Sequence, residues 1–516
     1  MGVYSYKDRA QSARLEAVTE GANESAKADA KPSRHRRGPF RPLSWTNARQ
    51  RAAYRLRVFY YRGIDLALTA TLTLGWVTYP GGIHQIGQIT LAQFAPYALG
   101  WTVAMWFMLA SSLYSFTSPR GIVRHALVAA LCAGSGAIAG IPLQLVVETA
   151  DIGRFSGWAI ALAGCILVLH TIWAAAISRG RRTGALIPNV VLVGATRSAE
   201  RMVQAALNRR DVNIIGIFDD RNDRVPEGIA GVPVLGTTDE LLAHHLTPYL
   251  DCIVLAVPAE ASERLRILER RLSSLPNRIA TLIQSADPSN SEIGAALDKL
   301  SATPVAALRR RAHPELSAFY KRLQDVLIGG IALLALSPLL LLIGLWIKLD
   351  SRGPALFKQE RHGFNQERIV VWKFRTMRID RMDRSGAQQV THDDDRITRA
   401  GRFLRVTSLD ELPQLLNVLR GEMSLVGPRP HAISMRTGNV VSSQIVAEYA
   451  HRHRIKPGLT GWAAINGSRG PMHTAEEVRR RVQLDIDYIE RQSFWLDVWI
   501  MLRTLPVLLG DKLAVR

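Results

Sequence analysis

Four long apolar stretches in the first part of the chain constrain its fold more than any other feature. Each is close to the about 20 residues that a helix needs to cross a bilayer. The last three contain no Lys, Arg, Asp or Glu, and the first carries Arg62 and Asp65 near its start, where the head-group layer tolerates charge. The sequence therefore predicts four transmembrane helices, at Phe59–Tyr79, Leu91–Phe116, Ala126–Val147 and Gly157–Ile177.

The charges between these stretches predict how they are oriented. Residues 34–57 contain eight arginines and no acidic residue, the connection 80–90 carries no charge, and the connection 117–125 again carries two arginines. Loops rich in Lys and Arg stay in the cytoplasm, so the N-terminus and everything after residue 177 are expected there. We thus expect a disordered basic tail at 1–57 and a four-helix transmembrane bundle at 58–178; buried helices of a soluble protein are the alternative.

A fifth uncharged run, Val326–Ile347, differs from the four spans because Ser337-Pro338 interrupts it. Proline removes a helical hydrogen bond and kinks a helix. Basic residues lie on both sides of the run, and a spanning helix would leave one basic cluster outside. The sequence therefore predicts a re-entrant, kinked membrane hairpin that enters and leaves on the cytoplasmic face. A simple fifth span is the alternative.

The charge of the chain narrows the class of its partners. The 516 residues carry 65 Lys and Arg against 44 Asp and Glu, a formal net charge of +21, yet 47% of them are hydrophobic. Disordered basic proteins have a lower apolar content, so a polyanionic ligand or an anionic membrane surface is expected. Three cysteines without a CxxC pair exclude a disulfide framework and a zinc ribbon.

Alternating strands and helices at 186–311 predict a Rossmann-like α/β domain with a parallel sheet. The first strand is expected at Asn189–Val193, and the turn after it keeps only one glycine of G-x-G-x-x-G. Thr196 stands where the backbone would approach a pyrophosphate, so a regulatory or structural role is favoured over NAD binding. Tyr249 is the only tyrosine here and has Ile253 four positions later, which disfavours an epimerase or dehydratase that needs Tyr-x-x-x-Lys.

Cations and a few carboxylates cluster at 318–516, the predicted α/β catalytic domain. Many basic groups around few acids, beside a membrane, suit phosphate-ester chemistry, which needs neutralised oxygens, a positioned nucleophile and usually Mg²⁺. The strongest candidate pair is Asp410-Glu411, because an ionised Asp410 could attack phosphorus to give an aspartyl-phosphate intermediate. Ser408 and Glu411 also fit a capping box that opens a helix, so Glu411 has a structural alternative.

A series of ordered motifs runs from Lys321 to Leu509. These motifs are Lys321-Arg322 with Asp325, Ser337-Pro338, Lys373-Phe374-Arg375, Asp395-Arg396-Ile397-Thr398, Thr407–Gln414, Asn417–Leu419, Met423–Pro430, Lys456–Trp462 and Leu484-Asp485. In them the chain resembles the bacterial polyprenyl glycosylphosphotransferases, also called monotopic phosphoglycosyl transferases. The four spans and the α/β insert are similar to the long members of that family.

This resemblance implies a two-step reaction at the bacterial inner membrane, with the soluble domains in the cytoplasm. A UDP-hexose gives its sugar-1-phosphate to the enzyme and releases UMP, and undecaprenyl phosphate then accepts the phosphosugar to start exopolysaccharide or capsule synthesis. Asp410 is implied to be the nucleophile and a ligand of Mg²⁺, and Glu411 the residue that prepares the lipid phosphate. Galactose-1-phosphate transfer and a non-catalytic scaffold of a polysaccharide export complex are the alternatives.

Further residues are assigned from charge and position. Guanidinium forks match diphosphate oxygens and Lys adds a point charge, although structural ion pairs are the alternative for each cation. The expected substrate-binding residues are Lys373, Arg375, Arg396, Arg429, Pro428 and Pro430. The acids 393–395 predict either a metal site or a polar turn before Arg396, and His431 is expected to pack or face solvent rather than to bind a ligand.

Two segments near the C-terminus complete the prediction. Ile465–Gly470 is similar to glucose-transferring members of the family, although Ala463-Ala464 stands where many relatives carry a Gln. Ser493–Leu509 is apolar with few charges and predicts either an interfacial helix in the head-group layer or a buried core helix. The expected partners are a UDP-sugar, undecaprenyl phosphate and the bilayer, with no nucleic acid; the oligomeric state is open, a homodimer among the options.

Overall fold

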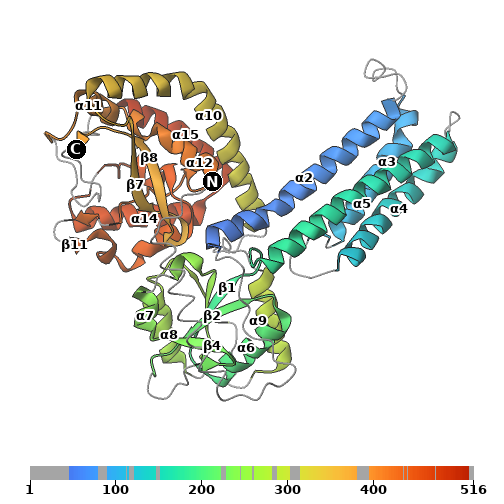
Figure 1. Ribbon diagram of the computed structural model, residues 1–516, viewed down its shortest axis with the longest axis horizontal. Helices are drawn as coiled ribbons and strands as arrows, with labels where there is room; N and C mark the ends of the chain where they lie inside the picture. Colours follow the sequence, from blue (N-terminus) through green and yellow to red (C-terminus); the bar gives the residue numbers. More distant parts are fainter. Residues whose placement is uncertain are drawn as a thin grey trace. The chain divides into compact units, whose positions relative to one another are not determined.

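A computed structural model describes the chain from residue 46 to 510 (Figure 1). Its gaps are 79–89, 112, 115–120, 147–150, 222–227, 244–245, 258–260, 282–287, 303–313, 380–393, 434, 438–439 and 471. Residues 1–45 of the tail expected at 1–57 lie outside the described residues. Residues 48–57 are helical, so the prediction of a disordered tail is wrong for this part of the chain. The chain divides into two compact units, one formed mainly by residues 50–187 and the other mainly by residues 188–516.

The first unit is helical. Its helices are α2 (Ala48–Thr78), α3 (Leu91–Ala110), α4 (Ile122–Val146) and α5 (Ile152–Arg182), one for each predicted span. Small residues let α3 and α4 approach closely, because a Cβ on Gly136 would collide with the carbonyl oxygen of Gly100 and the side chain of Ala104. Trp158 fills the space between the helices and is completely buried.

Among the described residues, three helices are long and apolar enough to cross a membrane. They are α4, α5 and the segment Leu316–Asp350. The sequence prediction thus receives direct support for two of its four spans and for the apolar run that contains Pro338. The protein is a membrane protein with a helical N-terminal region.

The second unit opens with the predicted parallel sheet. Its order is β3-β4-β2-β1-β5-β6, in which β3 runs antiparallel to β4 and the other neighbours are parallel. The strands are β1 (Asn189–Val193), β2 (Asn213–Phe218), β3 (Gly228–Ile229), β4 (Val232–Gly236), β5 (Cys252–Leu255) and β6 (Arg278–Ala280). β1 has the predicted bounds, and its five residues are all buried because helices cover both faces of the sheet.

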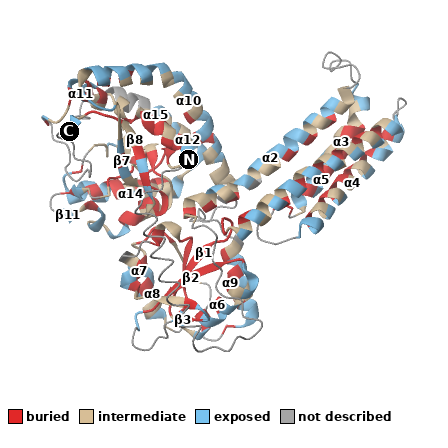
Figure 2. Ribbon diagram, viewed as in Figure 1, coloured by how far each residue is buried: buried red, intermediate tan, exposed pale blue. Residues whose placement is uncertain are grey.

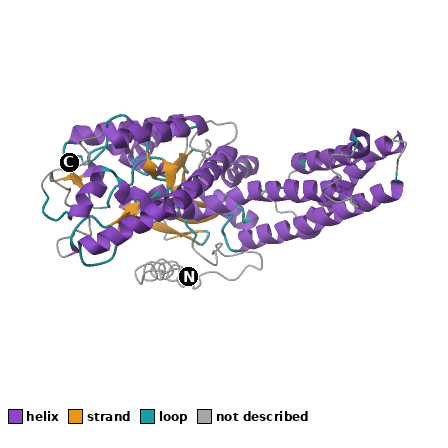
Figure 3. Ribbon diagram, turned by 90° about the horizontal axis from the view of Figure 1, so that it is seen from above, coloured by secondary structure: helices purple, strands orange, loops and turns teal. Residues whose placement is uncertain are grey.

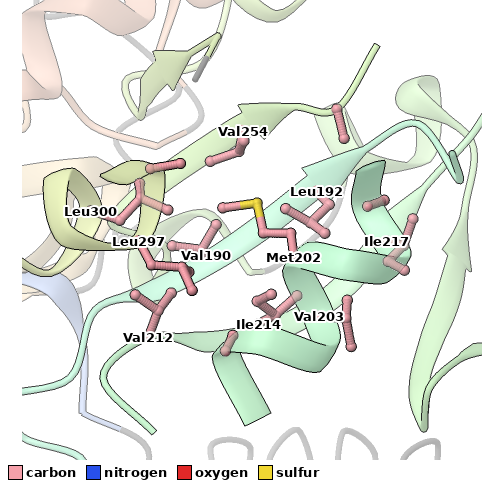
Figure 4. Close-up of a cluster of buried hydrophobic side chains, with 14 of the residues drawn as sticks. Val190, Leu192, Met202, Val203, Val212, Ile214, Ile217, Val254, Leu297 and Leu300 are labelled. Atoms are coloured by element: carbon pink, nitrogen blue, oxygen red, sulfur yellow. The ribbon is translucent and has the colours of Figure 1, made fainter. Parts of the chain in front are cut away.

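Helices and a short turn connect these strands. They are α6 (Arg197–Arg209), α7 (Thr238–Ala243), η3 (Thr247–Tyr249), α8 (Ser262–Leu272) and α9 (Asn290–Ala302). Figure 4 shows Met202 of α6 lying between Leu192 of β1 and Val254 of β5, in a core that Leu297 and Leu300 of α9 close. The β3–β4 pair, α7 and α9 were not predicted.

A single helix, α10 (Pro314–Asp350), carries the predicted hairpin segment and bends over the second unit in Figure 1. Pro338 cannot donate a hydrogen bond to the carbonyl of Leu334, four residues earlier. The hydroxyl of Ser337 donates to that carbonyl instead, at 2.7 Å. The Ser-Pro pair therefore bends the helix while one side-chain hydrogen bond replaces the missing backbone bond.

The rest of the unit follows α10. Its strands are β7 (Leu356–His362), β8 (Arg368–Phe374), β9 (Ser424–Val426), β10 (Arg436–Thr437), β11 (Val440–Val441) and β12 (Gly458–Thr460). Its helices are α11 (Arg399–Val406), α12 (Leu415–Arg420), α13 (Trp462–Ile465), α14 (Ala475–Arg491) and α15 (Phe494–Gly510), with short 3₁₀ turns η4 (Phe364–Gln366), η6 (Leu409–Gln414), η7 (Ser442–Gln444) and η8 (Ala447–Arg454). In Figure 3 the strands all belong to the second unit.

The tip of the β7–β8 hairpin is tied to the Rossmann-like domain by a buried side chain. Asn365 has a left-handed backbone (φ 54°) and donates from Nδ2 to the carbonyls of Thr247 and Leu250, at 2.7 and 2.9 Å. Asn277 Nδ2 donates in turn to Asn365 Oδ1 at 3.0 Å. These contacts fix the hairpin against the domain before it.

Helix α15 has features of both predicted alternatives for the C-terminal stretch, a buried core helix and an interfacial helix. Ile500 and Asp497 are fully buried, whereas Trp495 and Trp499 are 77% and 52% exposed. One face of the helix therefore belongs to the core and the other presents tryptophans outward, as a helix at a membrane surface does.

Candidate active site

The β7–β8 hairpin brings two cations to one face. Its register pairs Phe357 with Lys373 and Arg361 with Ile369. Because side chains alternate along a strand, Arg361 and Lys373 share their face with the buried Ile369 and Val371, which belong to the core. Ile369 and Val371 thus pack the hairpin against the core, and the two cations on the same face lie near the segment that follows α11.

That segment begins with a constrained turn. Ser408 lies in the left-handed region (φ 55°), and the 3₁₀ turn η6 starts directly after it. A non-glycine residue in this region costs free energy and is often found at functional sites. The capping-box prediction is wrong, because Ser408 makes no side-chain capping bond and its hydroxyl instead accepts a hydrogen bond from Arg469.

Glu411 is held by two of the predicted cations. Lys373 Nζ donates to Glu411 Oε1 at 2.7 Å, and Arg429 Nη1 donates to Oε2 at 3.0 Å while its Nη2 donates to Oε1. The side chain of Glu411 is only 12% exposed. Such a buried carboxylate requires charged partners, and both oxygens of Glu411 have them.

The pKa values of the two acids in the pair are shifted in opposite directions. Burial alone would raise the pKa of Glu411, but Arg429 and Lys373 outweigh burial and hold that pKa well below its ordinary value. Burial raises the pKa of Asp410, and the adjacent Glu411 charge raises it further, against the lowering effect of nearby cations. Asp410 is therefore a carboxylate kept basic beside a permanently ionised neighbour.

Among the described residues, no hydrogen bond occupies the Asp410 carboxylate. The nearby cations donate to other groups. Lys373 and Arg429 donate to Glu411, and Arg405 donates from Nε to the Thr376 hydroxyl at 2.8 Å. The Asp410 oxygens consequently remain available to a reacting atom, which is what a nucleophile requires.

The loop that carries Arg429 is fixed by close backbone packing. Gly427 donates from its backbone N–H to the Thr460 carbonyl at 2.9 Å, and Gly458 donates to the Pro428 carbonyl at the same distance. A Cβ on Gly458 would collide with the backbone of Gly427, so only glycine permits this crossing. Pro428 and Pro430 thus help to place Arg429 through their backbone; the Pro430 carbonyl accepts a hydrogen bond from Arg361.

A buried network supports the same loop from behind. Arg452 donates from Nη2 to the Arg429 carbonyl at 2.8 Å and to Asp485 Oδ2 at 2.7 Å. His431 Nδ1 lies 2.6 Å from the Tyr449 hydroxyl, and burial lowers the pKa of His431 well below 6.5. His431 is therefore a neutral packing residue, as expected, and Arg452 is the charged residue that positions the loop.

Sequence comparison identifies the group of proteins to which this architecture belongs. The sequence pattern of the bacterial sugar transferases matches residues 316–511. A relative from Xanthomonas campestris pv. campestris, a UDP-glucose:undecaprenyl-phosphate glucose-1-phosphate transferase, is 34% identical over 375 residues, which are 72% of this chain and 76% of the relative. The chain belongs to the bacterial sugar transferase family.

Two further relatives show how this bacterial sugar transferase is assembled. An undecaprenyl-phosphate glucose phosphotransferase of Komagataeibacter xylinus is 37% identical over 352 residues, 67% of this chain but only 64% of that protein's length. The exopolysaccharide production protein PSS of Rhizobium leguminosarum bv. phaseoli is 50% identical over 184 residues, 36% of this chain and 92% of that protein. The C-terminal domain thus also occurs almost alone.

The pattern described as a CoA-binding domain matches residues 112–281 of this sugar transferase. Part of that range forms the sheet, and Asp219 lies at the end of its strand β2. Asp219 accepts a hydrogen bond from the Ala195 N–H at 2.7 Å and forms an ion pair with Arg221 at 2.8 Å. These contacts occupy the carboxylate that a dinucleotide ribose would need.

Two residues that contribute to the site charge were missed as site residues from the sequence. Arg361 and Arg405 both interact electrostatically with Asp410 and Glu411. The signal for Arg361 was the pairing of β7 with β8, because the register Arg361–Ile369 puts Arg361 on the face of Lys373. Arg405, on α11, had no such signal, because its proximity depends on the turn at Ser408.

Two other predicted phosphate ligands lie in structural contacts. Arg375 is 1% exposed and donates from Nη2 to the Ser351 carbonyl at 2.7 Å and from Nη1 to the Arg352 carbonyl. It therefore caps the C-terminal end of α10, which corrects its assignment. Arg396 forms an ion pair with Asp394 at 2.5 Å and donates from its backbone N–H to Asp394 Oδ1 at 3.1 Å, so a polar turn occurs here; Asp393 lies outside the described residues.

Replacing Arg375 with Met should therefore destabilise the sugar transferase without weakening donor binding. Losing several hydrogen bonds from a buried guanidinium should lower the free energy of unfolding by about 2–4 kcal/mol. A melting curve in detergent measures the first effect, and the KM for UDP-glucose measures the second. A large rise in KM with unchanged melting temperature would restore Arg375 to the substrate site.

Proposed function

We propose that this protein transfers glucose-1-phosphate from UDP-glucose to undecaprenyl phosphate, releasing UMP and initiating exopolysaccharide synthesis. The observation that carries the proposal is the arrangement of four cations around two carboxylates. Lys373, Arg361, Arg405 and Arg429 surround Asp410 and Glu411. The group has a formal excess of two positive charges, which suits the diphosphate of a nucleotide sugar. The names of the relatives from Xanthomonas and Komagataeibacter support the same substrates.

In the first step the carboxylate of Asp410 attacks the phosphorus that bears the sugar. The bond from that phosphorus to the bridging oxygen breaks, and UMP leaves with both electrons of that bond. The product is an acyl phosphate between Asp410 and glucose-1-phosphate. A carboxylate whose proton affinity is raised is a better nucleophile, provided that it is ionised at the working pH.

In the second step an oxygen of undecaprenyl phosphate attacks the same phosphorus. The bond to Asp410 breaks, the carboxylate is regenerated, and the lipid diphosphate sugar is released. Glu411 already binds Lys373 and Arg429, so an incoming phosphate can share those cations and approach its target beside Glu411. We assign to Glu411 the role of holding these cations and preparing the lipid phosphate.

Asp410 also suits a magnesium ion. Mg²⁺ is commonly held by one or two carboxylates together with substrate phosphates, and Asp410 is the carboxylate of the pair whose oxygens are unoccupied among the described residues. Within those residues there is no group of three or more acidic, His or Cys side chains that could hold a metal alone. Bound there with the diphosphate, Mg²⁺ would neutralise phosphate charge.

The decisive test is a screen of UDP-sugars with the purified protein, undecaprenyl phosphate and Mg²⁺. UDP-glucose should give the fastest release of UMP, with UDP-galactose slower, and an undecaprenyl diphosphate sugar should accumulate in equal amount. Fastest release from UDP-galactose would favour the alternative hexose. If no UDP-sugar releases UMP, the protein is a scaffold rather than a transferase.

We further propose that α2–α5 form a four-helix bundle in the inner membrane and that α10 enters and leaves on the cytoplasmic face. The bend at Pro338 and the exposed apolar residues of α10 support this arrangement, including Ile331 at 69% and Leu341 at 75% exposure. The basic residues on both sides of the helix support it as well.

A labelling experiment tests the topology of α10. In a variant whose native cysteines Cys132, Cys165 and Cys252 are replaced, Lys348→Cys should resist a membrane-impermeant thiol reagent added to intact cells. The same cysteine should react after the membrane is opened, and a cysteine in the connection 80–90 provides the externally labelled control. Labelling of position 348 in intact cells would mean that α10 spans the membrane.

A further inference from the structure

A cavity of about 500 Å³ lies between the start of α10 and the turn from α14 to α15. The lining residues that matter here are Tyr320, Lys321, Gln324, Arg491, Phe494 and Asp497. None of the residues of the Asp410 site lines it. The cavity is therefore separate from the proposed transfer chemistry.

Gln324 is the most informative residue in this cavity. The residue is only 5% exposed, yet neither its amide nitrogen nor its amide oxygen has a hydrogen-bond partner among the described residues. A buried amide without partners costs free energy, and most such groups in folded proteins are paired. An amide that lines a cavity of this size offers one donor group and one acceptor to a ligand.

The charges in the cavity are unequally satisfied. Lys321 Nζ donates to Asp497 Oδ2 at 2.6 Å, and the hydroxyl of Tyr488 donates to Asp497 Oδ1 at 2.6 Å. Arg491 is exposed at the end of α14, and no ion pair of its own is found among the described residues. The lining thus has one balanced pair and one cation left over, which favours a ligand with a single negative charge.

The surroundings of the cavity are apolar and aromatic. On α10, Leu327 and Ile331 are 54% and 69% exposed, and on α15 Phe494 and Trp495 are 48% and 77% exposed. Figure 2 shows α10 largely in the colours of exposed and intermediate residues. Aromatic and basic residues at the edge of an apolar surface are typical of the level of lipid head groups.

We propose that this cavity binds the head group of a membrane phospholipid that carries a phosphate and a hydrogen-bond donor beyond it, as phosphatidylethanolamine does. The phosphate would lie against Arg491, and the terminal ammonium would donate to the amide oxygen of Gln324. The acyl chains would follow the apolar residues of α10 and α15. Because the proposed topology places the apolar residues of α10 in the bilayer, membrane lipids lie next to the cavity, and a lipid is favoured over a soluble phosphate compound.

Native mass spectrometry of the full chain in detergent tests this proposal with short-chain phosphatidylethanolamine as the probe. The wild type should bind one lipid, and Gln324→Leu and Arg491→Gln should each lower the affinity at least tenfold. Arg479→Gln, an exposed arginine on the same helix α14, is the matched control and should bind as the wild type does. Because binding is measured without UDP-sugar, the result is independent of the proposed transfer activity.

Several outcomes would overturn the proposal. Equal binding of phosphatidylcholine, which has no terminal donor, would remove the role of Gln324, and equal competition by glycerol 3-phosphate would identify a soluble ligand instead. Unchanged lipid affinity in Gln324→Leu would mean that the lipid does not bind in this cavity. Gln324→Leu removes an unpaired buried amide, so its melting temperature without lipid should equal or exceed that of the wild type, which separates lost binding from misfolding.

Discussion

Asp410→Asn should abolish UMP release from UDP-glucose and prevent any covalent adduct of protein and hexose phosphate. The amide cannot attack phosphorus, so the rate should fall at least about 10³-fold, by analogy with the loss of other enzymic nucleophiles. The adduct is sought by intact-protein mass spectrometry after mixing the enzyme with UDP-glucose alone, because without undecaprenyl phosphate the first step cannot proceed to the second.

A matched substitution separates chemistry from charge. Asp487→Asn on α14 changes the same atoms away from the site and should leave both UMP release and the adduct intact. The melting temperature of Asp410→Asn should not fall, since the half-buried wild-type carboxylate has no hydrogen-bond partner among the described residues that the substitution could remove. Full activity in the Asp410 variant would overturn its assignment as nucleophile.

Glu411→Gln should slow the reaction about 10²-fold near neutral pH and shift the acid limb of its pH–rate profile to lower pH. In the wild type the Glu411 charge helps to raise the pKa of Asp410 above its ordinary value of 3.8. Removing that charge, and freeing Lys373 and Arg429 from their carboxylate, both stabilise ionised Asp410. The pKa of Asp410 therefore falls, and activity persists to a lower pH before protonation stops it.

The profile is measured as kcat/KM for UMP release, which reports ionisations of the free enzyme. Glu490→Gln, an exposed position on α14, supplies the control and should leave the limb unchanged. A limb that stays in place or moves to higher pH in Glu411→Gln would mean that Asp410 is not the group whose ionisation controls the rate.

The sequence predicted the parts of this fold that depend on local pattern. Strand β1 has its predicted bounds because four consecutive apolar residues, Val190–Val193, follow Asn189, and such a short apolar run is typical of a strand buried on both faces. Lys373 and Arg429 were assigned to the same site as Asp410 and Glu411 from charge and position, but their ion pairs with Glu411 were not predicted. A sequence pattern shows which residue types occur and at what spacing, but not which atoms the side chains contact in the fold.

The rest depended on tertiary geometry. Arg375 follows Lys373 by two residues in the same basic motif, yet one binds Glu411 and the other the end of α10, because the strand ends at Phe374 and the chain turns there. The capping-box prediction failed for a related reason. The pattern S-x-x-E assumes an extended residue at Ser408, whereas this serine adopts a left-handed backbone.

The amide contact between Asn365 and Asn277 has a consequence for how the chain can be shortened. The hairpin whose tip carries Asn365 is the one that carries Lys373, so these hydrogen bonds connect the Rossmann-like domain with the strand that positions Lys373 beside Glu411. The Rhizobium protein, matched along nearly its whole length by the C-terminal part of this chain, shows that relatives of this size exist without the preceding domain. Cutting this chain to that size would expose Asn365, which is buried in the full chain, and a substitution at position 365 would have to accompany the cut.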